Sequence, residues 1–412
     1  MTKQQNIPSG YNPDSYRDSP LGQIPSDWEV MELNNIADVR DGTHESPCYY
    51  ENGVIFITSK NIKNGELDFS DITYISKEDA ENINKRSKVE RGDILMSMIG
   101  TIGNCVLVDF EPNFCIKNVG LIKPQNIDKY FLIQFFYSPI FQNYLIRNLD
   151  GGIQKFISLG GLRELKLPIP IKIEQRAIAA CLSNWDNAIT KVQAILAQRE
   201  LRKKWLMQNL LTGKKRLKGF DGEWKEYKLE YFIEEYNEKP KDGNKYEVLT
   251  SAKSGLMKQT DYYGDNRITN REDADYNIIP PNYITYRSRS DDGLFTFNKN
   301  TLGFTGLISG YYPVFTIKNG DIDFILMYCN YYRQKLTQYS IGTSQLVLSI
   351  NALKSASFIL PFTEEQTAIA QVLRAADKEI QLLKNKLEKL KEQKKGLMQV
   401  LLTGKKRLAV KN

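Results

Sequence analysis

The chain is poor in the residues that form most catalytic centres. Its 412 residues include a single histidine, His44, and five cysteines. None of the cysteines has the CxxC spacing of a zinc or redox site, so neither a metal nor a disulfide scaffold is expected. The phosphate-binding GxxxxGK[ST] loop of ATPases is also missing. His44 lies in Asp41-Gly-Thr-His44, a turn-forming stretch that favours an exposed loop position over a catalytic base. We predict no catalytic residue and no metal.

The sequence also lacks a long hydrophobic run. No stretch approaches the 18 or more apolar residues that a membrane-spanning helix needs. The first ten residues, Met1 to Gly10, are polar and do not have the apolar core of a signal peptide. At 41% hydrophobic residues, the composition is that of a globular protein with two to four structural units. We expect a soluble protein in the cytoplasm.

One segment of the chain occurs twice. Residues 174–217 align without a gap on residues 365–408, at an offset of 191, and 22 of the 44 aligned positions are identical. Both copies begin with Glu-Gln and end with Leu-Leu-Thr-Gly-Lys-Lys-Arg-Leu. Agreement of this kind indicates an internal duplication. The stretches that begin at Trp28 and Trp224 also match, so the chain consists of two copies of one unit, a globular part followed by this segment.

The duplicated segment has the pattern of a long helix. Its apolar residues recur in steps of three and four, which predicts a coiled-coil seam. The seam residues are Ile178, Leu182, Trp185, Ile189, Val192 and Leu196 in the first copy, and Ile369, Leu373, Ile380, Leu383, Leu387 and Leu390 in the second. Lys203 and Lys394 interrupt the seam at equivalent places, where a lysine can fix register or orientation. Gly213 and Gly404 stand where a helix C-cap is expected. We expect helices of about 35 residues, or about 50 Å, that pair with each other; the alternative is that each binds a different partner.

Charge is distributed unevenly along the chain. The net charge is +7, yet residues 171–217 carry ten Lys or Arg against three Asp or Glu, and residues 361–412 carry twelve against six. The helices therefore hold the positive excess, and the globular parts are acidic on balance. A basic helix face can meet nucleic-acid phosphates, or it can be the solvated back of a coiled coil. If the globular parts bind DNA, they must use local patches.

The globular parts are predicted to be mixed, with strands dominant. Expected strands are residues 53–58, 93–99 and 104–109 in the first part and 283–287, 293–297 and 310–317 in the second. Residues 130–146, interrupted by Pro139, and residues 323–336 are expected to be helical. We divide the chain into a first globular domain, a first helix, a second globular domain and a second helix. Their boundaries are 1–170, 171–217, 218–360 and 361–412.

The loops of both domains offer groups suited to DNA. Arginine to guanine and asparagine to adenine are the geometrically favoured pairings in the major groove, whereas lysine and serine mostly position the protein on phosphates. The candidate DNA-binding residues are Thr43, His44, Ser59, Lys60, Asn61 and Lys63 in the first domain, and Lys253, Ser254, Arg287 and Arg289 in the second. Since the two domains diverge strongly between their matched ends, each is expected to read something different.

This layout resembles the specificity (S) subunit of type I restriction–modification enzymes. The resemblance covers nearly the whole chain and is strongest in the two helices that end in Leu-Leu-Thr-Gly-Lys-Lys-Arg-Leu. Three further stretches of the first half resemble runs common in that family. They are Gly92-Asp-Ile-Leu-Met-Ser97 with Gly100-Thr-Ile-Gly103, Asp41-Gly-Thr-His44 with Thr58-Ser-Lys-Asn-Ile62, and Leu167-Pro-Ile-Pro170 leading into Glu174-Gln175-Arg176. The second half departs from the Gly-Asp-Ile-Leu pattern at Asn282-Tyr-Ile-Thr285.

The resemblance implies an α+β fold with two target recognition domains, each followed by a long helix. The two helices would pair as an antiparallel coiled coil with pseudo-twofold symmetry. It implies a chain that binds no cofactor and catalyses nothing itself. Each domain would read one half of a bipartite, asymmetric site in double-stranded DNA. Two methyltransferase (M) subunits carrying S-adenosylmethionine would dock on the helices, and restriction (R) subunits would add ATP- and Mg-dependent cleavage. Two alternatives stay open: a coiled-coil scaffold whose domains bind protein, and a subunit that serves methylation alone.

Overall fold

The computed structural model describes residues 15–151, 155–240, 246–264 and 276–409; the polar N-terminal stretch Met1–Gly10 lies outside them. The chain forms two compact units. Unit 1 comprises Met1–Ala194 together with Asn385–Asn412, and unit 2 comprises Ile195–Lys384. Each unit therefore contains one globular domain, the first half of the helix that follows this domain, and the second half of the other helix. This division crosses both long helices, whereas the sequence suggested boundaries at their ends.

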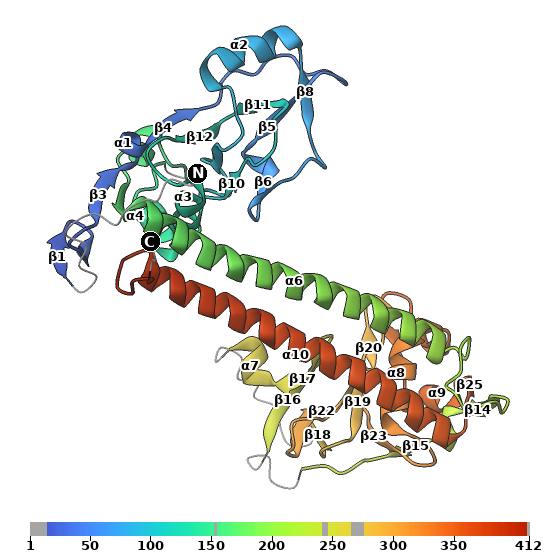
Figure 1. Ribbon diagram of the computed structural model, residues 1–412. Helices are drawn as coiled ribbons and strands as arrows, with labels where there is room; N and C mark the ends of the chain where they lie inside the picture. The colour runs from blue at the N-terminus through green and yellow to red at the C-terminus, as the bar shows by residue number, and fades with distance from the viewer. Residues whose placement is uncertain (1–14, 152–154, 241–245, 265–275, 410–412) are drawn as a thin grey trace. The chain divides into compact units, whose positions relative to one another are not determined.

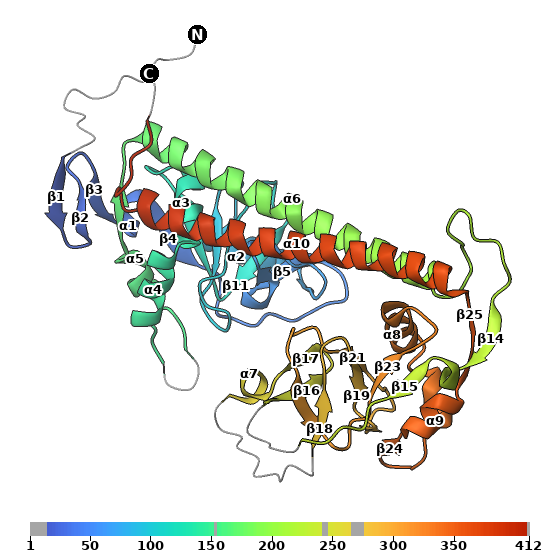
Figure 2. The same cartoon turned by 90° about the horizontal axis from the view of Figure 1, so that it is seen from below.

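The two long helices are α6 (Lys172–Leu210) and α10 (Thr363–Leu401), of 39 residues each. They pair side by side in opposite directions (Figure 1; Figure 2). In unit 2, for example, Arg199 Nε donates to Glu379 Oε1 at 2.6 Å, and Lys384 lies 3.1 Å from Glu200. The twelve predicted seam residues are all buried or half-buried. The expected antiparallel pairing is confirmed, with helices slightly longer than predicted.

The first domain is organised around a four-stranded antiparallel sheet in the order β4–β12–β9–β10. These strands are Ala37–Asp41, Val119–Pro124, Ile94–Ser97 and Cys105–Leu107. A second sheet, in the order β11–β5–β8, pairs β11 (Phe114–Lys117) in parallel with β5 (Val54–Thr58) and β5 antiparallel with β8 (Thr73–Ile75). The strands predicted at 53–58, 93–99 and 104–109 are thus present. The shorter strands are β1 (Tyr16–Ser19), β2 (Gly22–Pro25), β3 (Glu29–Glu32), β6 (Ile62–Lys63), β7 (Glu66–Leu67) and β13 (Lys166–Ile169).

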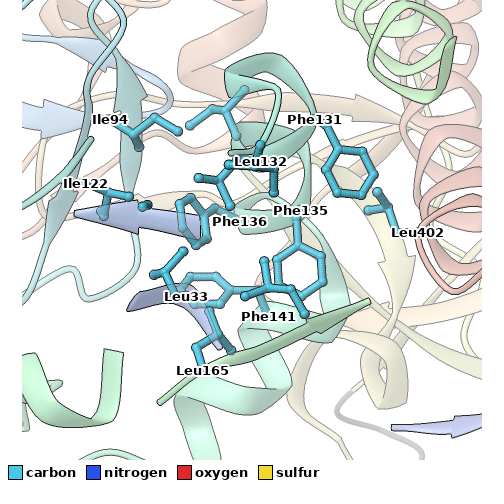
Figure 3. Packing of buried hydrophobic residues seen from close by; sticks show 14 of the residues in the cluster. Leu33, Ile94, Ile122, Phe131, Leu132, Phe135, Phe136, Phe141, Leu165 and Leu402 are labelled. Carbon is cyan, nitrogen blue, oxygen red and sulfur yellow. The ribbon is translucent and has the colours of Figure 1, made fainter. Parts of the chain in front are cut away.

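Five α-helices lie in the described part of the first domain. They are α1 (Leu33–Ile36), α2 (Lys77–Ser87), α3 (Lys129–Phe136), α4 (Pro139–Arg147) and α5 (Leu159–Arg163). Of these, α2 packs against β11, while α3 joins the domain to the long helices. The single run predicted at 130–146 is in fact two helices, because Ser138 caps a new helix with Pro139 at its first position. Phe131, Phe135 and Phe136 of α3 enter the domain core, where Leu402 lies beside Phe131 (Figure 3). The end of the chain therefore completes the core of the first domain.

The second domain repeats this plan with different strands. Its main sheet has the order β15–β23–β19–β21, made of Ile233–Glu235, Val314–Ile317, Ile284–Tyr286 and Phe297–Lys299. A second sheet, β17–β16–β22–β18, is made of Gly255–Lys258, Glu247–Ala252, Gly306–Ser309 and Tyr276–Ile279. The remaining elements are β14 (Lys225–Lys228), β20 (Arg289–Ser290), β24 (Leu346–Val347), β25 (Ser357–Leu360), α7 (Gln259–Tyr263), α8 (Ile322–Tyr331) and α9 (Ile350–Ser355).

Some predictions for this domain were wrong. Residues 293–296 form no strand, and only Phe297 at the end of the predicted segment enters β21. Phe295 is fully buried, but through its side chain in the core and not through a strand ladder. The predicted strand at 310–317 is reduced to β23, since Gly310 to Tyr312 make a turn after β22. The helix expected at 323–336 is present as α8 but ends at Tyr331.

Candidate nucleic-acid interface

In the first domain, His44 is held by two side chains. Its ring nitrogens are hydrogen-bonded to Asp41 Oδ2 at 2.8 Å and to Asn118 Oδ1 at 2.7 Å. Asp41 ends β4 and its carboxylate is only 8% exposed, whereas the His44 side chain is 68% exposed. Arg86 of α2 donates to the other oxygen of Asp41. The imidazole is therefore fixed in direction, with both ring nitrogens engaged, while the ring itself stays exposed.

Asn118 brings the two predicted loops of the first domain together. It adopts a left-handed conformation, with φ of 51°, which asparagine tolerates better than most residues. Its side chain reaches His44, and its carbonyl oxygen accepts a hydrogen bond from Ser59 Oγ at 2.9 Å. Residues 58–64 and 99–104 then border a surface hollow of about 650 Å³. Four of its lining residues are Ser59, Lys60, Lys63 and Asn118.

Asn61 lies inside its loop and not on the loop surface. It is 2% exposed, and its amide oxygen accepts from Thr58 N at 3.0 Å. Its amide nitrogen donates to the carbonyl oxygens of Asp68 and Asp71 at 3.0 and 2.9 Å. All of these bonds are internal, so Asn61 shapes the loop that presents its neighbours. Lys60 and Lys63 are exposed and form ion pairs with Asp71 and Asp68, and surface pairs of this kind are weak enough to be exchanged for phosphates.

In the second domain, the two candidate arginines share one face of the chain. Tyr286, Ser288 and Ser290 are buried, whereas Arg287 and Arg289 between them are exposed. This alternation is that of an extended segment, in which successive side chains point to opposite sides. Ser288 and Ser290 are held internally, since their hydroxyls donate to Tyr311 O and Asp292 Oδ1. The guanidinium of Arg289 lies 4.5 Å from the centre of the Tyr311 ring.

All four candidates of the second domain border one hollow. Lys253 and Ser254 form the two-residue turn between β16 and β17. Together with Arg287 and Arg289 they line a depression of about 580 Å³. Five further side chains that the sequence analysis did not select lie in this hollow or in the adjoining one of about 310 Å³: Tyr262, Tyr263, Tyr311, Tyr312 and Gln345. The face is thus positive and aromatic, which suits phosphates and base edges.

Nearby carboxylates are held in their charged form. The pKa of Asp292 is lowered by its hydrogen bonds with Lys253 and Ser290. In the first domain, the pKa of Asp68 is lowered by hydrogen bonds with Lys63 and Ser70. Each hollow therefore contains a lysine that already has an anionic partner. A DNA phosphate would replace this partner instead of neutralising an isolated charge.

Each globular domain is joined to the helices by a buried ion-pair joint. In unit 1, Trp28 Nε1 donates to Glu174 Oε2 at 3.0 Å, and Arg407 donates to both oxygens of the same carboxylate at 2.6 and 2.7 Å. Arg407 also donates twice to Asp27. Burial opposes the charge of Arg407, but these hydrogen bonds outweigh it and raise its pKa. In unit 2, Trp224 and Arg216 bind Glu365 in the same way, at 3.2, 2.5 and 2.6 Å.

A second joint connects each long helix to a helix of its domain. Gln175 Oε1 accepts from Asp128 N at 2.8 Å, and Gln366 Oε1 accepts from Asp321 N at 3.1 Å. Asp128 and Asp321 are the N-caps of α3 and α8. The repeated Glu-Gln pair thus fastens each domain to the first turn of the helix that follows it. The arginine of each Lys-Lys-Arg run closes the opposite helix onto the same joint and is not available to nucleic acid.

The family comparison agrees with this architecture. The family described as "Type I restriction modification DNA specificity domain" matches residues 25–198 and again residues 222–392. The chain therefore belongs to the type I restriction–modification specificity subunits. It is a DNA specificity subunit with two target recognition domains. Catalysis in such complexes lies in the methyltransferase and restriction subunits, to which S-adenosylmethionine and ATP also belong.

Several known proteins resemble the whole chain or half of it. A Methanocaldococcus jannaschii protein named for the specificity subunit of restriction enzyme MjaX is 27% identical over 97% of this chain and 98% of its own length. The EcoBI specificity subunit of Escherichia coli is 30% identical, over 46% of each chain. The crystal structure of the S subunit from M. genitalium has the same fold, with a TM-score of 0.57 at 14% identity; the match covers 91% of this chain and 96% of that one.

The described part of the chain contains no helix long and apolar enough to cross a membrane. Within the same ranges, no cluster of three or more histidine, cysteine, aspartate or glutamate side chains could hold a metal ion. As a member of this family, the chain assembles with the subunits of a type I restriction–modification complex and with DNA.

Proposed function

We propose that each domain reads one half of a bipartite, asymmetric DNA site. The first domain would use Thr43, His44, Ser59, Lys60 and Lys63 at the face organised by Asn118. The second would use Lys253, Ser254, Arg287 and Arg289. One observation carries the proposal: the joints of the two units use the same tryptophan, glutamate, glutamine and arginine, while the faces differ in kind. The first is a polar network around one imidazole, and the second is a pair of arginines among tyrosines.

The different faces would read the duplex in different ways. Arginine can donate two hydrogen bonds to O6 and N7 of guanine, so Arg287 and Arg289 are suited to guanine. The exposed ring of His44, whose two nitrogens are bonded to Asp41 and Asn118, would pack against the duplex or exchange one of these partners for a base or a phosphate. The lysines would contact phosphates and set the position of each domain along the duplex. Double-stranded DNA is therefore the proposed ligand of both domains.

The paired helices are proposed to space the two readers and to dock the partners. We assign residues 1–170 and 218–360 to recognition, and residues 171–217 and 361–412 to the helices. Two methyltransferase subunits would bind this repeated framework, one for each copy, and restriction subunits would join the assembly. Such a complex would act in the cytoplasm. Its site would contain a spacer of unread base pairs, because readers on a framework of this length span about one turn of DNA, roughly 34 Å.

The decisive experiment is to co-express the chain with its methyltransferase partner and to map methylated adenines across a genome. We expect one bipartite motif with two different halves and a spacer of fixed length. Replacing residues 231–340 with the equivalent part of another specificity subunit should change one half only. Salt-sensitive binding of the assembled complex to duplex DNA is expected in parallel. A motif without a spacer, or a replacement that changes both halves, would contradict two independent readers.

A further inference from the structure

Two charged pairs cross the apolar seam between α6 and α10. Lys394 Nζ donates to Asp186 Oδ1 at 2.6 Å in unit 1, and Lys203 Nζ donates to Asp377 Oδ1 in unit 2. The two lysines occupy equivalent positions in the duplicated segment, and so do the two aspartates. These are the lysines that interrupt the seam in the sequence. Each lysine is paired with an aspartate of the opposite helix, so its charge within the apolar seam is neutralised.

Both pairs belong to a single antiparallel register. Lys203 follows Asp186 by 17 residues along α6, and Asp377 precedes Lys394 by the same 17 residues along α10. One alignment of the two helices therefore satisfies both pairs at once. The lysine of the first pair is the more enclosed: the side chain of Lys394 is 11% exposed and that of Asp186 is 41% exposed, and Lys394 Nζ lies 5.8 Å from the centre of the Tyr137 ring. Asp186 also accepts from Gln134 Nε2 of α3 at 2.7 Å.

The heptad repeat of apolar residues alone does not select this register. The joints at the helix ends favour the same register, since Arg407 meets Glu174 and Arg216 meets Glu365, and the two crossing pairs act together with them. A seam that repeats every seven residues places apolar side chains opposite each other again after a slip of one heptad. The aspartates respond differently to such a slip. In one direction Asp186 would face Leu401 and Asp377 would face Leu210; in the other they would face Leu387 and Leu196. A charge that faces leucine instead of its partner is unfavourable, so the two pairs discriminate against both slipped arrangements.

Other charged pairs between the helices discriminate less. Arg199 with Glu379 and Lys384 with Glu200 follow nearly the same alignment, but all four side chains are 36% exposed or more. Exposed pairs keep their solvation when they separate, and their contribution is small. In the crossing pairs the lysines are more enclosed, Lys394 at 11% and Lys203 at 29%, whereas their aspartates are 41% and 47% exposed; the enclosed lysines make these pairs the stronger determinant. The exposed pairs provide matched controls.

We propose that the Lys203–Asp377 and Lys394–Asp186 pairs select the register of the two helices and thereby the length of the DNA spacer. This inference rests on the proposed reading of a bipartite site. Each domain is fastened to the first turn of the helix that follows it, through Trp28, Glu174 and Gln175 in unit 1 and their equivalents in unit 2. The separation of the readers then follows the offset between the two helix starts. One heptad is about 10 Å of helix, which corresponds to about three base pairs of DNA.

The test is a variant that lacks both crossing pairs: Lys203→Met, Lys394→Met, Asp186→Asn and Asp377→Asn together. Replacing an enclosed ion pair with apolar residues of similar volume is often neutral for stability, so the chain should fold. Co-expressed with the methyltransferase, the variant should methylate the wild-type motif and also a second class of sites. The second class should have unchanged half-sites and a spacer longer or shorter by about three base pairs.

Two further variants complete the test. Exchanging the charges, with Asp186→Lys and Lys394→Asp, should keep one spacer, because the pair persists in reverse. Glu200→Gln with Glu379→Gln, at the exposed pairs, should also keep one spacer. A single unchanged spacer in the variant without the crossing pairs would overturn the inference. If that variant methylates nothing, the charge exchange decides: a single wild-type spacer supports the inference, and loss of methylation overturns it. Absence of any bipartite motif with the wild-type chain would instead refute the proposed function.

Discussion

The two units differ at the faces they present to solvent and agree at the joints beneath them. Glu174, Trp28 and Arg407 in unit 1 correspond to Glu365, Trp224 and Arg216 in unit 2, with the same hydrogen bonds. The two faces do not correspond in this way: the network around His44 has no equivalent in the second domain, whose face is built on two arginines. Each joint must bind the same duplicated helix segment, so its residues are alike in both units. Each face has to fit only its own ligand, so its residues can differ. The duplication therefore separates residues that hold the domains from residues that choose the sequence.

Even the joints are unequal in strength. Arg407 engages two carboxylates, of Glu174 and Asp27, and its side chain is 7% exposed. Arg216 engages Glu365 and the carbonyl oxygen of Gly222, and its side chain is 26% exposed. The neighbouring glycines differ too. A Cβ added at Gly404 would meet Pro25 Cδ at 2.3 Å, whereas at Gly213 it would meet Trp224 at 3.4 Å. Unit 1 is therefore more tightly closed.

The largest expected effect comes from breaking these joints. Arg407→Ala should destabilise the chain by about 3–5 kcal/mol, because it leaves the fully buried Glu174 carboxylate without its cation. Arg216→Ala should cost less, about 1.5–3 kcal/mol, because Arg216 engages a single carboxylate and its own side chain is partly solvated, although Glu365 is buried as well. Urea unfolding of the full chain, followed by tryptophan fluorescence, measures both. Lys405→Ala and Lys214→Ala, at exposed lysines of the same tails, are controls. Equal losses of stability for the two variants would contradict the conclusion that the joint of unit 1 is the stronger one.

A smaller effect is expected at the face of the second domain. Arg289→Ala should reduce methylation of the wild-type site about 10- to 100-fold and relax the second half-site, because one bidentate base contact contributes about 1–3 kcal/mol of discrimination. The first half-site should not change. Mapping of methylated sites, with Lys228→Ala at an exposed position of the same domain as control, tests this. Relaxation of both half-sites would show that the two faces are not independent.

The smallest effect is expected at the face of the first domain. His44→Ala removes one exposed ring with two hydrogen bonds, so a loss of about 2- to 10-fold is expected, or about 0.5–1.5 kcal/mol. It should be confined to the first half-site. Asn118→Ala should cause a larger loss, since it releases His44 and also gives up a favoured left-handed position. Competition binding of duplexes that differ in one half-site, with the assembled complex, compares the two variants. An effect of His44→Ala larger than that of Asn118→Ala would contradict the positioning role of Asn118.

The sequence predicted the framework more fully than the faces. The gapless repeat and its heptads predicted two long helices that pair, because neither could bury its apolar stripe alone, and the family resemblance added the antiparallel direction. The Glu-Gln and Lys-Lys-Arg runs were visible, but their contact was not. Arg407 of the second copy binds Glu174 of the first copy. This contact forms because the antiparallel arrangement places the end of one helix beside the start of the other, which no local sequence pattern reveals.

Polar loop residues were harder to interpret. Asn61 has the composition of a base reader and lies buried, while Asn118 was not selected and connects the two loops. Both functions depend on contacts between segments far apart in the chain. No local pattern distinguishes an asparagine that holds a loop from one that faces a ligand. In the second domain, the alternation around Arg287 and Arg289 was a usable signal, but the tyrosines that surround them come from two separate segments, residues 262–263 and 311–312.

The core of the first domain includes Met398, Leu401 and Leu402, from the last part of the chain. During synthesis, residues 15–170 would leave the ribosome more than two hundred residues before these side chains exist. The first domain would have to wait, with part of its apolar core open, while the second can close on α10 as soon as that helix emerges. A message truncated near its end would thus damage the domain that was translated first. In this molecule, the order of synthesis and the order of completion are reversed.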